Sequence, residues 1–353
     1  MKILFVKLSA IGDIVHALPA LAAIQRTLPD AEVDWVAEER SAEILRGNPL
    51  IRNLIEVDTH TIRSTWSPER ILSEIKRQVS SLRTNQYDAA FDLQGLLKSA
   101  AIAKLSGAKR CIGFDKTNLR EPAARLMYTQ TVPVPQGINV IDKNLALVCE
   151  ALKIDAGNDV YDFPIATDAQ HRLEAEVIER KSARPFALLN PGGGWATKLW
   201  RAADFGRLAK RMSEEAGIEP IIVTGPKELH LSNEVCDNAG GLELIQVQPS
   251  LKGFYELARR AAVYVGGDTG PTHIAVAAGT PVVGIFGPTE WWRNGSPRAD
   301  DISVGRDDIG CRVDCHRRTC SKWICMDISV DAVFNAVARR IELAATPRRE
   351  AAV

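Results

Sequence analysis

Residues 265–289 read VGGDTGPTHIAVAAGTPVVGIFGPT, and this stretch decides the fold class. Residues 262–265 are apolar and suit a buried strand, while Pro271 suits the first turn of a helix. The tripeptide Gly-Thr-Pro at 279–281 suits the end of that helix, and a second apolar run follows it. The stretch therefore predicts strand, loop, helix and strand, which is the repeating unit of a parallel sheet covered by helices.

The loop of this unit is a candidate anion site. A loop that follows a parallel strand lies at the carboxyl edge of the sheet, where ligands bind in such folds. The helix start at Gly270 and Pro271 offers unpaired N–H groups and a partial positive charge, and both attract phosphate. The alternative is that Asp268 or Thr269 caps the helix of an ordinary α/β domain.

The same alternation of strand and helix opens the chain. Residues 3–8 form an apolar run with one lysine, and the loop SAIGD at 9–13 follows it. The amphipathic run at 14–28 predicts a helix, in which Pro19 should cause a kink because it removes a hydrogen bond. A strand-like run at 31–39 completes a β-α-β opening.

The pattern weakens near residues 155–185 and restarts with the apolar run FALLN. We therefore expect an α/β protein with two doubly wound, Rossmann-like domains, 1–165 and 166–353, that face each other across a central cleft. The last helix, about 330–343, has apolar residues at helical spacing and could pack back on the first domain.

Composition limits the classes of function. The 353 residues are 46% hydrophobic and 25% charged, which is typical of a globular protein. Lysine plus arginine and aspartate plus glutamate number 44 each, so overall charge gives no case for nucleic-acid binding. The start MKILFVKLSAIGD is a poor secretory signal, and the apolar run at 274–286 is too short to span a bilayer. We therefore expect a cytoplasmic location, which does not exclude contact with a membrane surface.

The seven cysteines are distributed unevenly. Three of them stand alone in apolar or helical contexts and suit core positions: Cys111, Cys149 and Cys236. The other four have the spacing C-x3-C-x4-C-x4-C, which differs from the paired C-x2-C of common zinc sites: Cys311, Cys315, Cys320 and Cys325. A structural metal, disulfides and a reduced thiol cluster are the alternatives, and a cytoplasmic location argues against stable disulfides.

Loops in the C-terminal half carry residues suited to a diphosphate. The glycines at 192–194 let backbone N–H groups approach a ligand, and Lys198 adds a positive charge, although the spacing matches no P-loop or dinucleotide fingerprint. Glu228 follows a predicted strand and could accept hydrogen bonds from ribose hydroxyls. The alternatives are a solvated Lys198 on a flexible turn and a glutamate that stabilises its own helix.

The N-terminal half offers one carboxylate and several cations. Asp13 lies at a helix start and would be ionised at neutral pH, so it could accept a proton from a hydroxyl or could only cap the helix. The basic residues could bind a phosphorylated or carboxylated acceptor if they converge, while scattered surface charge is the alternative: Lys7, Arg63, Lys98 and Arg120.

Taken in order along the chain, these motifs resemble one known family. The segments that carry the resemblance are MKILFVKLSAIGDIVHALPAL, YDAAFDLQGLLKSA, NLREPAARLMY, NPGGGWATKLW, GGDTGPTHIAVAAGTPVVGIFGPT and the cysteine-rich tail. Together they resemble the ADP-heptose:lipopolysaccharide heptosyltransferases of glycosyltransferase family 9, and DLQGLLKSA and REPAA are most similar to heptosyltransferase I.

The resemblance implies a GT-B fold and an inverting transfer that needs no metal or other cofactor. Asp13 would be the general base, and Lys198 would stabilise the departing diphosphate. The other implied donor-site residues are Gly193, Gly194, Glu228, Asp268, Thr269, Gly270 and His273. The implied acceptor-site residues are Lys7, Arg63, Lys98 and Arg120.

The implied partners are ADP-heptose and the Kdo sugars of lipid A at the inner-membrane surface, so we expect a cytoplasmic enzyme bound peripherally to that membrane. One alternative is a transferase like heptosyltransferase II, with a different acceptor. A nucleotide-sugar epimerase is a further alternative, but it would need a second acid/base arrangement, which the sequence does not reveal. A non-catalytic sugar-nucleotide-binding protein would keep the loops of the second half and have no need of Asp13.

Overall fold

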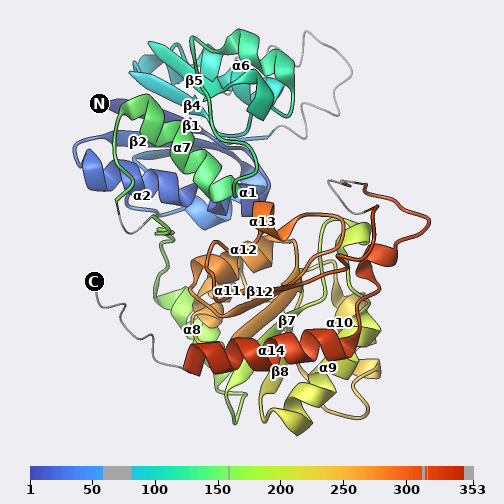
Figure 1. Cartoon of the computed structure of the whole chain (residues 1–353). Coiled ribbons are helices and arrows are strands. Elements are labelled where there is room, and N and C mark those ends of the chain that lie inside the picture. The colour runs from blue at the N-terminus through green and yellow to red at the C-terminus, as the bar shows by residue number, and fades with distance from the viewer. Residues whose placement is uncertain (59–81, 158–159, 312–314, 316, 346–353) are drawn as a thin grey trace, which may run out of the picture. The chain divides into compact units, whose positions relative to one another are not determined.

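The computed structural model describes the chain except residues 59–81, 158–159, 312–314, 316 and 346–353. The chain forms two compact units, Met1–Ala166 and Thr167–Val353. Each unit is built around one parallel sheet with helices on its faces (Figure 1). The alternation of strands and helices predicted for both halves is therefore confirmed.

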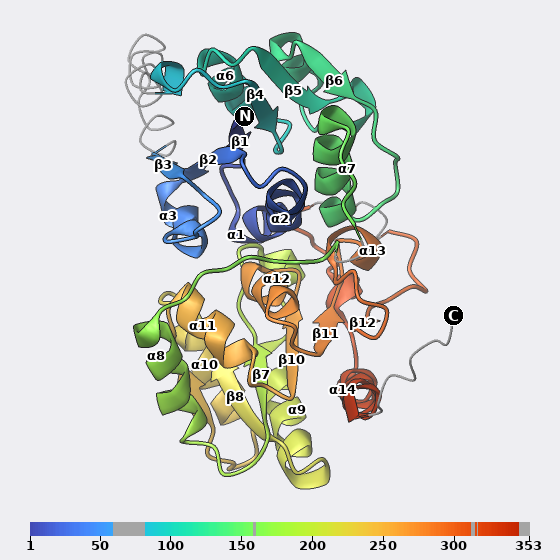
Figure 2. The ribbon, with the colours of Figure 1, turned by 90° about the vertical axis from the view of Figure 1, so that its left-hand side faces the viewer.

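Within the described residues, the first unit has a six-stranded sheet in the order β3-β2-β1-β4-β5-β6 (Figure 2). The strands are β1 (Lys2–Val6), β2 (Glu32–Glu38), β3 (Asn53–Val57), β4 (Ala89–Asp92), β5 (Arg110–Phe114) and β6 (Gln130–Val132). The described helices are α1 (Ile11–Val15), α2 (Leu18–Thr27), α3 (Glu39–Ala42), α6 (Leu97–Leu105) and α7 (Val140–Leu152). The order changes direction beside β1 and β4, and ligands bind at such a switch point in doubly wound sheets.

Buried aromatic residues fix the register at the centre of this sheet. Phe5 is the parallel partner of both Trp35 and Phe91. Its ring contacts both aromatic rings edge to face, at centroid distances of 5.3 and 5.8 Å. Such pairs add stability beyond the area that they bury, so β1 is held firmly between β2 and β4.

Pro19 lies at the start of a second helix instead of kinking a single one. The expected single helix at 14–28 is divided into α1, which ends at Val15, and α2, which begins at Leu18. Pro19 lies in the first turn of α2, where its missing N–H would have had no partner within the helix. The break leaves α1 as a short helix directly after β1, and Asp13 lies on it.

The second unit repeats the architecture, and its sheet has the order β12-β11-β10-β7-β8-β9 within the described residues. The strands are β7 (Phe186–Asn190), β8 (Glu219–Val223), β9 (Ile245–Val247), β10 (Val263–Gly267), β11 (Val282–Ile285) and β12 (Ile302–Val304). The described helices are α8 (Ala169–Glu179), α9 (Ala202–Glu215), α10 (Leu229–Asp237), α11 (Leu251–Ala258), α12 (Gly270–Ala277), α13 (Trp291–Asn294) and α14 (Val330–Ala345). Residues 265–289 thus contain the end of β10, then α12 and β11, as their pattern predicts.

The C-terminal helix packs on the unit to which it belongs. We expected that it could return to the first domain, but α14 contacts α9 and the strands β10, β11 and β12 of the second unit (Figure 1). Its apolar face, with Val333 and Val337, joins the buried core of that unit. Within the described residues, no helix is long and apolar enough to cross a membrane.

A buried ion pair ties α14 to the end of the sheet. The Nε atom of Arg340 lies 2.8 Å from Oδ1 of Asp301, and both side chains are almost completely buried. The same carboxylate oxygen accepts a hydrogen bond from the N–H of Val282 at 2.9 Å. Removal of Arg340 would therefore leave a buried charge without its cation.

We predict that Arg340→Ala destabilises the second unit by about 3–5 kcal/mol, the usual cost of breaking a buried pair from one side. Urea unfolding followed by tryptophan fluorescence measures the loss. The neighbouring Arg339→Ala, at an exposed position of the same helix, is the matched control and should change little. Equal unfolding midpoints for the two variants would show that the pair does not anchor α14.

Candidate functional site

Four loops of the second unit lie at the carboxyl edge of its sheet. They follow β7, β8, β10 and β11, which are neighbours in parallel register. Asn190, the last residue of β7, donates from Nδ2 to the carbonyl of Val223 at 2.8 Å, so it links the ends of two strands. The second-unit residues predicted for the donor are all on these loops or on the first turn of α12.

Glu228 joins the glycine-rich loop to the loop after β8. Its Oε1 accepts a hydrogen bond from the N–H of Gly193 at 2.9 Å, and its Oε2 accepts from the N–H of Gly225 at 2.8 Å. A Cβ atom at Gly192 would lie 2.2 Å from Oε2, so a side chain there would displace the Glu228 carboxylate. Glu228 directly precedes α10, but its carboxylate makes no capping hydrogen bond to that helix. This differs from the alternative in which Glu228 only stabilises its own helix. Each carboxylate oxygen can still accept a further hydrogen bond from a ligand.

The glycines of the loop have different surroundings. A Cβ atom at Gly193 would lie 2.8 Å from Cγ2 of Thr269, which brings the loop against the start of α12. A Cβ atom at Gly194 would have no atom within 4 Å, so packing does not require glycine there. Close approach of neighbouring side chains, Glu228 at Gly192 and Thr269 at Gly193, therefore explains these two glycines but not the third.

Asp268 is the centre of a cluster of polar side chains. Lys198 lies with Nζ 2.5 Å from Oδ2 of Asp268, and His273 lies with Nε2 3.2 Å from Oδ1. Asn294, on α13, donates from Nδ2 to Oδ2 at 3.3 Å. Asp268 is only 8% exposed, and Lys198 arrives from a segment 70 residues earlier in the chain.

Burial alone would raise the pKa of Asp268. The hydrogen bonds and charges of His273 and Lys198 outweigh that effect and hold this pKa far below its usual value. The carboxylate is therefore ionised at neutral pH, and it orients Lys198 and His273 at the start of α12.

Neither residue proposed as a simple helix cap acts as one. Thr269 is the residue before α12, but its side chain makes no capping hydrogen bond. Its hydroxyl lies 3.5 Å from Oδ1 of Asn190, and Asp268 is engaged by Lys198 and His273. The first-turn N–H groups of α12 therefore remain suited to an external acceptor such as phosphate.

In the first unit, Asp13 lies on the first turn of α1 and is half-buried. Its Oδ2 accepts a hydrogen bond from the N–H of Ala10 at 3.1 Å, so the carboxylate closes its own loop after β1. This contact occupies one oxygen and leaves the other available as a proton acceptor.

Sequence reasoning missed Gln94, which holds this loop from the end of β4. Its Oε1 accepts from the N–H of Leu8 at 2.7 Å, and its Nε2 donates to the carbonyl of Ser9 at 2.6 Å. Asp92 accepts the N–H of Gln94 at 2.9 Å and the hydroxyl of Tyr128 at 2.6 Å, and thereby fixes the loop that carries Gln94. No pattern marks Gln94, because its role depends on a pairing between β1 and β4.

Lys7 lies inside the first unit and is 4% exposed. Its Nζ donates to the carbonyl of Leu93 at 2.6 Å. Burial lowers the pKa of Lys7, while the nearby charges of Asp13 and Asp92 act in the opposite direction. Lys7 therefore supports the loops that surround Asp13, and its contact with an acceptor stays a prediction.

The other predicted acceptor residues have varied positions. Lys98 lies with Nζ 2.7 Å from Oε1 of Glu38, a buried residue at the end of β2 that also binds Arg40. Arg120 is exposed on the loop next to Glu121, whose Oε2 accepts the N–H of Leu97. Arg40, Lys98 and Arg120 follow β2, β4 and β5, respectively, so they share the carboxyl edge of the first sheet. Arg63, the remaining predicted acceptor residue, lies outside the described residues.

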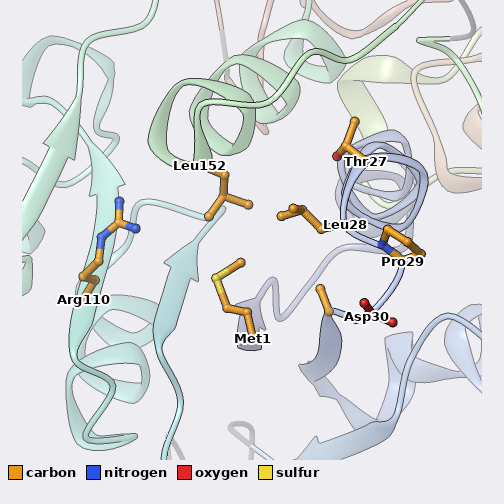
Figure 3. Close-up of a pocket in the computed structure, with 8 residues that line it drawn as sticks. Met1, Thr27, Leu28, Pro29, Asp30, Arg110 and Leu152 are labelled. Atoms are coloured by element: carbon orange, nitrogen blue, oxygen red, sulfur yellow. The ribbon is translucent and has the colours of Figure 1, made fainter.

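A pocket of about 480 Å³ lies at the opposite, amino edge of the first sheet (Figure 3). Met1, Leu28 and Leu152 surround it. Arg110 also lines it, but that guanidinium already donates to Gln130 and to the carbonyl of Ala151. Ligands of doubly wound sheets bind at the carboxyl edge, so we assign this pocket no chemistry.

All seven cysteines are free thiols. Cys325 is buried, and burial, together with the nearby thiols led by Cys315, raises its pKa. Within the described ranges, no three His, Cys, Asp or Glu side chains are grouped so that they could hold a metal. Of the three alternatives for the four clustered cysteines, disulfides are therefore not what the structure shows.

The two doubly wound parallel sheets define an α/β protein, and comparison with known proteins places it among the glycosyltransferases of the GT-B class. The chain belongs to glycosyltransferase family 9, the heptosyltransferases, because the model of that family matches residues 75–323. It is 31% identical over 324 residues to lipopolysaccharide heptosyltransferase 1 of Pseudomonas aeruginosa, a match that covers 91% of this chain and 88% of that protein.

Two solved structures of the heptosyltransferase WaaC of Escherichia coli have the same fold. The structure with ADP has a TM-score of 0.75 at 24% identity and covers 96% of this chain and all of that chain. The structure with ADP-2-deoxy-2-fluoro heptose has a TM-score of 0.74 at 24% identity and covers 98% of this chain and all of that chain. The resemblance inferred from the motifs and the GT-B fold that it implied are thus confirmed.

The cluster around Asp268 predicts a defined pH dependence of stability. Because the folded-state pKa of Asp268 is lowered, its ionised form stabilises the protein above the unfolded pKa of about 3.9, and this contribution is lost as the pH falls below that value. We expect Asp268→Asn to lower the free energy of unfolding by about 2 kcal/mol at pH 7 and equally at pH 5.5. At pH 3.5 the difference in the free energy of unfolding between this variant and the wild type should be smaller.

Urea unfolding at the three pH values makes the measurement. Asp308→Asn removes a carboxylate from an exposed pair with Arg306, so it controls for the loss of one charge and should change stability little. A loss for Asp268→Asn that is as large at pH 3.5 as at pH 7 would contradict the assigned ionisation.

Proposed function

We propose that this protein transfers L-glycero-D-manno-heptose from ADP-heptose to the Kdo sugars of lipid A, as a heptosyltransferase I. The observation that carries the proposal is the meeting of Lys198, the glycine-rich loop and the start of α12 at one edge of the second sheet. A cation, backbone N–H groups and a helix start are together suited to a diphosphate. The identity of the sugar and of the acceptor comes from the similarity to lipopolysaccharide heptosyltransferase 1.

In this proposal the second unit binds the donor. Lys198 and the N–H groups of Thr269 and Gly270 would contact the diphosphate, with Gly193 and Gly194 beside it. Glu228 would accept hydrogen bonds from the ribose, while Asp268 orients Lys198 and His273 near the phosphates or the heptose. The WaaC structures that contain ADP or an ADP-heptose analogue share this fold, which supports the assignment of the donor.

The reaction would be a single displacement with inversion. The acceptor hydroxyl attacks the anomeric carbon, the bond from that carbon to the diphosphate oxygen breaks, and the electron pair leaves with ADP. Asp13 would take the hydroxyl proton, because its carboxylate is half-exposed and has one oxygen outside its own loop. Lys198 and the N–H groups would stabilise the charge that develops on the diphosphate, so the step requires no metal and no covalent intermediate.

The first unit would bind the anionic acceptor. Lys98 and Arg120 lie on loops at the carboxyl edge of its sheet, and Arg63 and Lys7 complete the predicted set. Glu38 partly neutralises Lys98, so Arg120 would be the more available cation within the described residues. Because the acceptor is a membrane lipid, we propose that the enzyme is cytoplasmic and binds peripherally to the inner membrane.

The test of this function is the release of ADP from ADP-heptose with two acceptors, Kdo-lipid A and a heptosylated core. Release with Kdo-lipid A alone is expected. Release with the heptosylated core alone would instead assign a later transferase, such as one like heptosyltransferase II. Absence of release with both acceptors, together with binding of the donor, would favour a non-catalytic sugar-nucleotide-binding protein.

Two variants should distinguish the role of Asp13 as general base from the contact between Lys198 and the diphosphate. Asp13→Asn should lower turnover by about 10²- to 10⁴-fold while the affinity for ADP stays unchanged, because the amide cannot accept the proton. Lys198→Met should weaken ADP binding and slow transfer, because it removes the ammonium but keeps much of the side-chain volume. Calorimetric titration with ADP and steady-state ADP release measure the two properties.

Thermal unfolding must show that both variants are folded. Normal turnover by folded Asp13→Asn would remove Asp13 from the role of base. Unchanged ADP affinity and turnover in Lys198→Met would remove the contact between Lys198 and the diphosphate.

A further inference from the structure

The cation at the donor edge is largely balanced by a carboxylate. Lys198 forms its closest contact, 2.5 Å, with Asp268, and both side chains are mostly buried. A lysine–aspartate pair has no net charge, whereas the diphosphate of a sugar nucleotide carries about two negative charges at neutral pH. A site built for this ligand should therefore present a further cation near Lys198.

Arg318 is in a position to supply that charge. Its guanidinium carbon lies 5.0 Å from the ring centroid of Trp195, and Nζ of Lys198 lies 4.5 Å from the same centroid. Both cations thus share one indole ring, on the loop that follows β7. Arg318 is exposed, and in the part of the chain that the structure describes no carboxylate pairs with it.

Hydrogen bonds hold the segment around Arg318 against this loop. The hydroxyl of Thr197 donates to the carbonyl of Arg317 at 2.6 Å. The indole N–H of Trp323 donates to the carbonyl of Thr197 at 3.0 Å. The chain is therefore attached to the turn that carries Lys198 on both sides of Arg318. This attachment orders the segment that carries the Arg318 guanidinium in the absence of a ligand, which lowers the entropy cost of ligand binding.

We propose that Arg318 is a second cation of the diphosphate site, presented by the cysteine-rich segment of the chain. The inference rests on the proposed donor, a nucleoside diphosphate sugar. A guanidinium can donate two parallel hydrogen bonds to phosphate oxygens, and its stacking on Trp195 leaves its N–H edge available for them. This assignment gives a function to a segment whose cysteines had suggested only a metal, disulfides or a thiol cluster.

The test is calorimetric titration of the full-length protein with ADP and with AMP. Arg318→Ala should weaken ADP binding by about 10-fold or more, as expected for a lost charge-assisted hydrogen bond, and should weaken AMP binding less. Arg317→Ala is the matched control, because it removes the same charge from the adjacent exposed position while keeping the backbone carbonyl that Thr197 contacts. We expect it to bind ADP within about 2-fold of the wild type. Arg318→Lys, which keeps the charge but loses the two-pronged geometry, should be intermediate.

The outcomes distinguish this inference from the proposed function. Equal ADP affinities for folded Arg318→Ala and Arg317→Ala would overturn the role of Arg318 and leave the donor assignment intact. Equal losses of ADP and AMP affinity in Arg318→Ala would also overturn it, since they would show a general disturbance of the loop. Failure of the wild-type protein to bind ADP would overturn the proposed donor itself.

Discussion

The buried carboxylate of Asp268 is the constraint on which the donor edge depends. An isolated charge at such a position would cost several kcal/mol, so it must be paired and hydrogen-bonded. Its partners Lys198, His273 and Asn294 come from three different segments of the second unit. The carboxylate therefore fixes the loop after β7, the start of α12 and the end of α13 together, and it orients the groups proposed to contact a diphosphate.

Two other polar side chains, Glu228 and Gln94, also fix loops, and they do so through hydrogen bonds to backbone atoms. Glu228 accepts two N–H groups from loops of the second unit, and Gln94 binds both an N–H and a carbonyl of the loop that leads to Asp13. Neither residue depends on a flexible surface contact. Each unit therefore presents a carboxyl edge whose backbone is fixed in advance, which is the arrangement that electrostatic stabilisation of a transition state requires.

Local signals predicted most of the fold, because apolar runs and glycine or proline stops act over a few residues. They placed β10, α12 and β11 correctly, but they could not show that Pro19 starts a new helix. The contacts of the site were harder to predict, because they join distant segments. Lys198 reaches Asp268 across 70 residues, and Gln94 reaches Leu8 across 86. The positions of Gln94 and Arg318 follow from strand order and loop packing, which no spacing in the sequence records.

Hydrogen–deuterium exchange of the wild-type protein, with and without ADP, tests the central claim most directly. The claim is that the carboxyl edge of the second sheet holds the nucleotide diphosphate. It predicts slower exchange on addition of ADP in residues 192–198 and 268–273, and no comparable change in residues 9–13 or 94–98 of the first unit. Protection confined to the first-unit loops, or spread evenly over both units, would contradict the account.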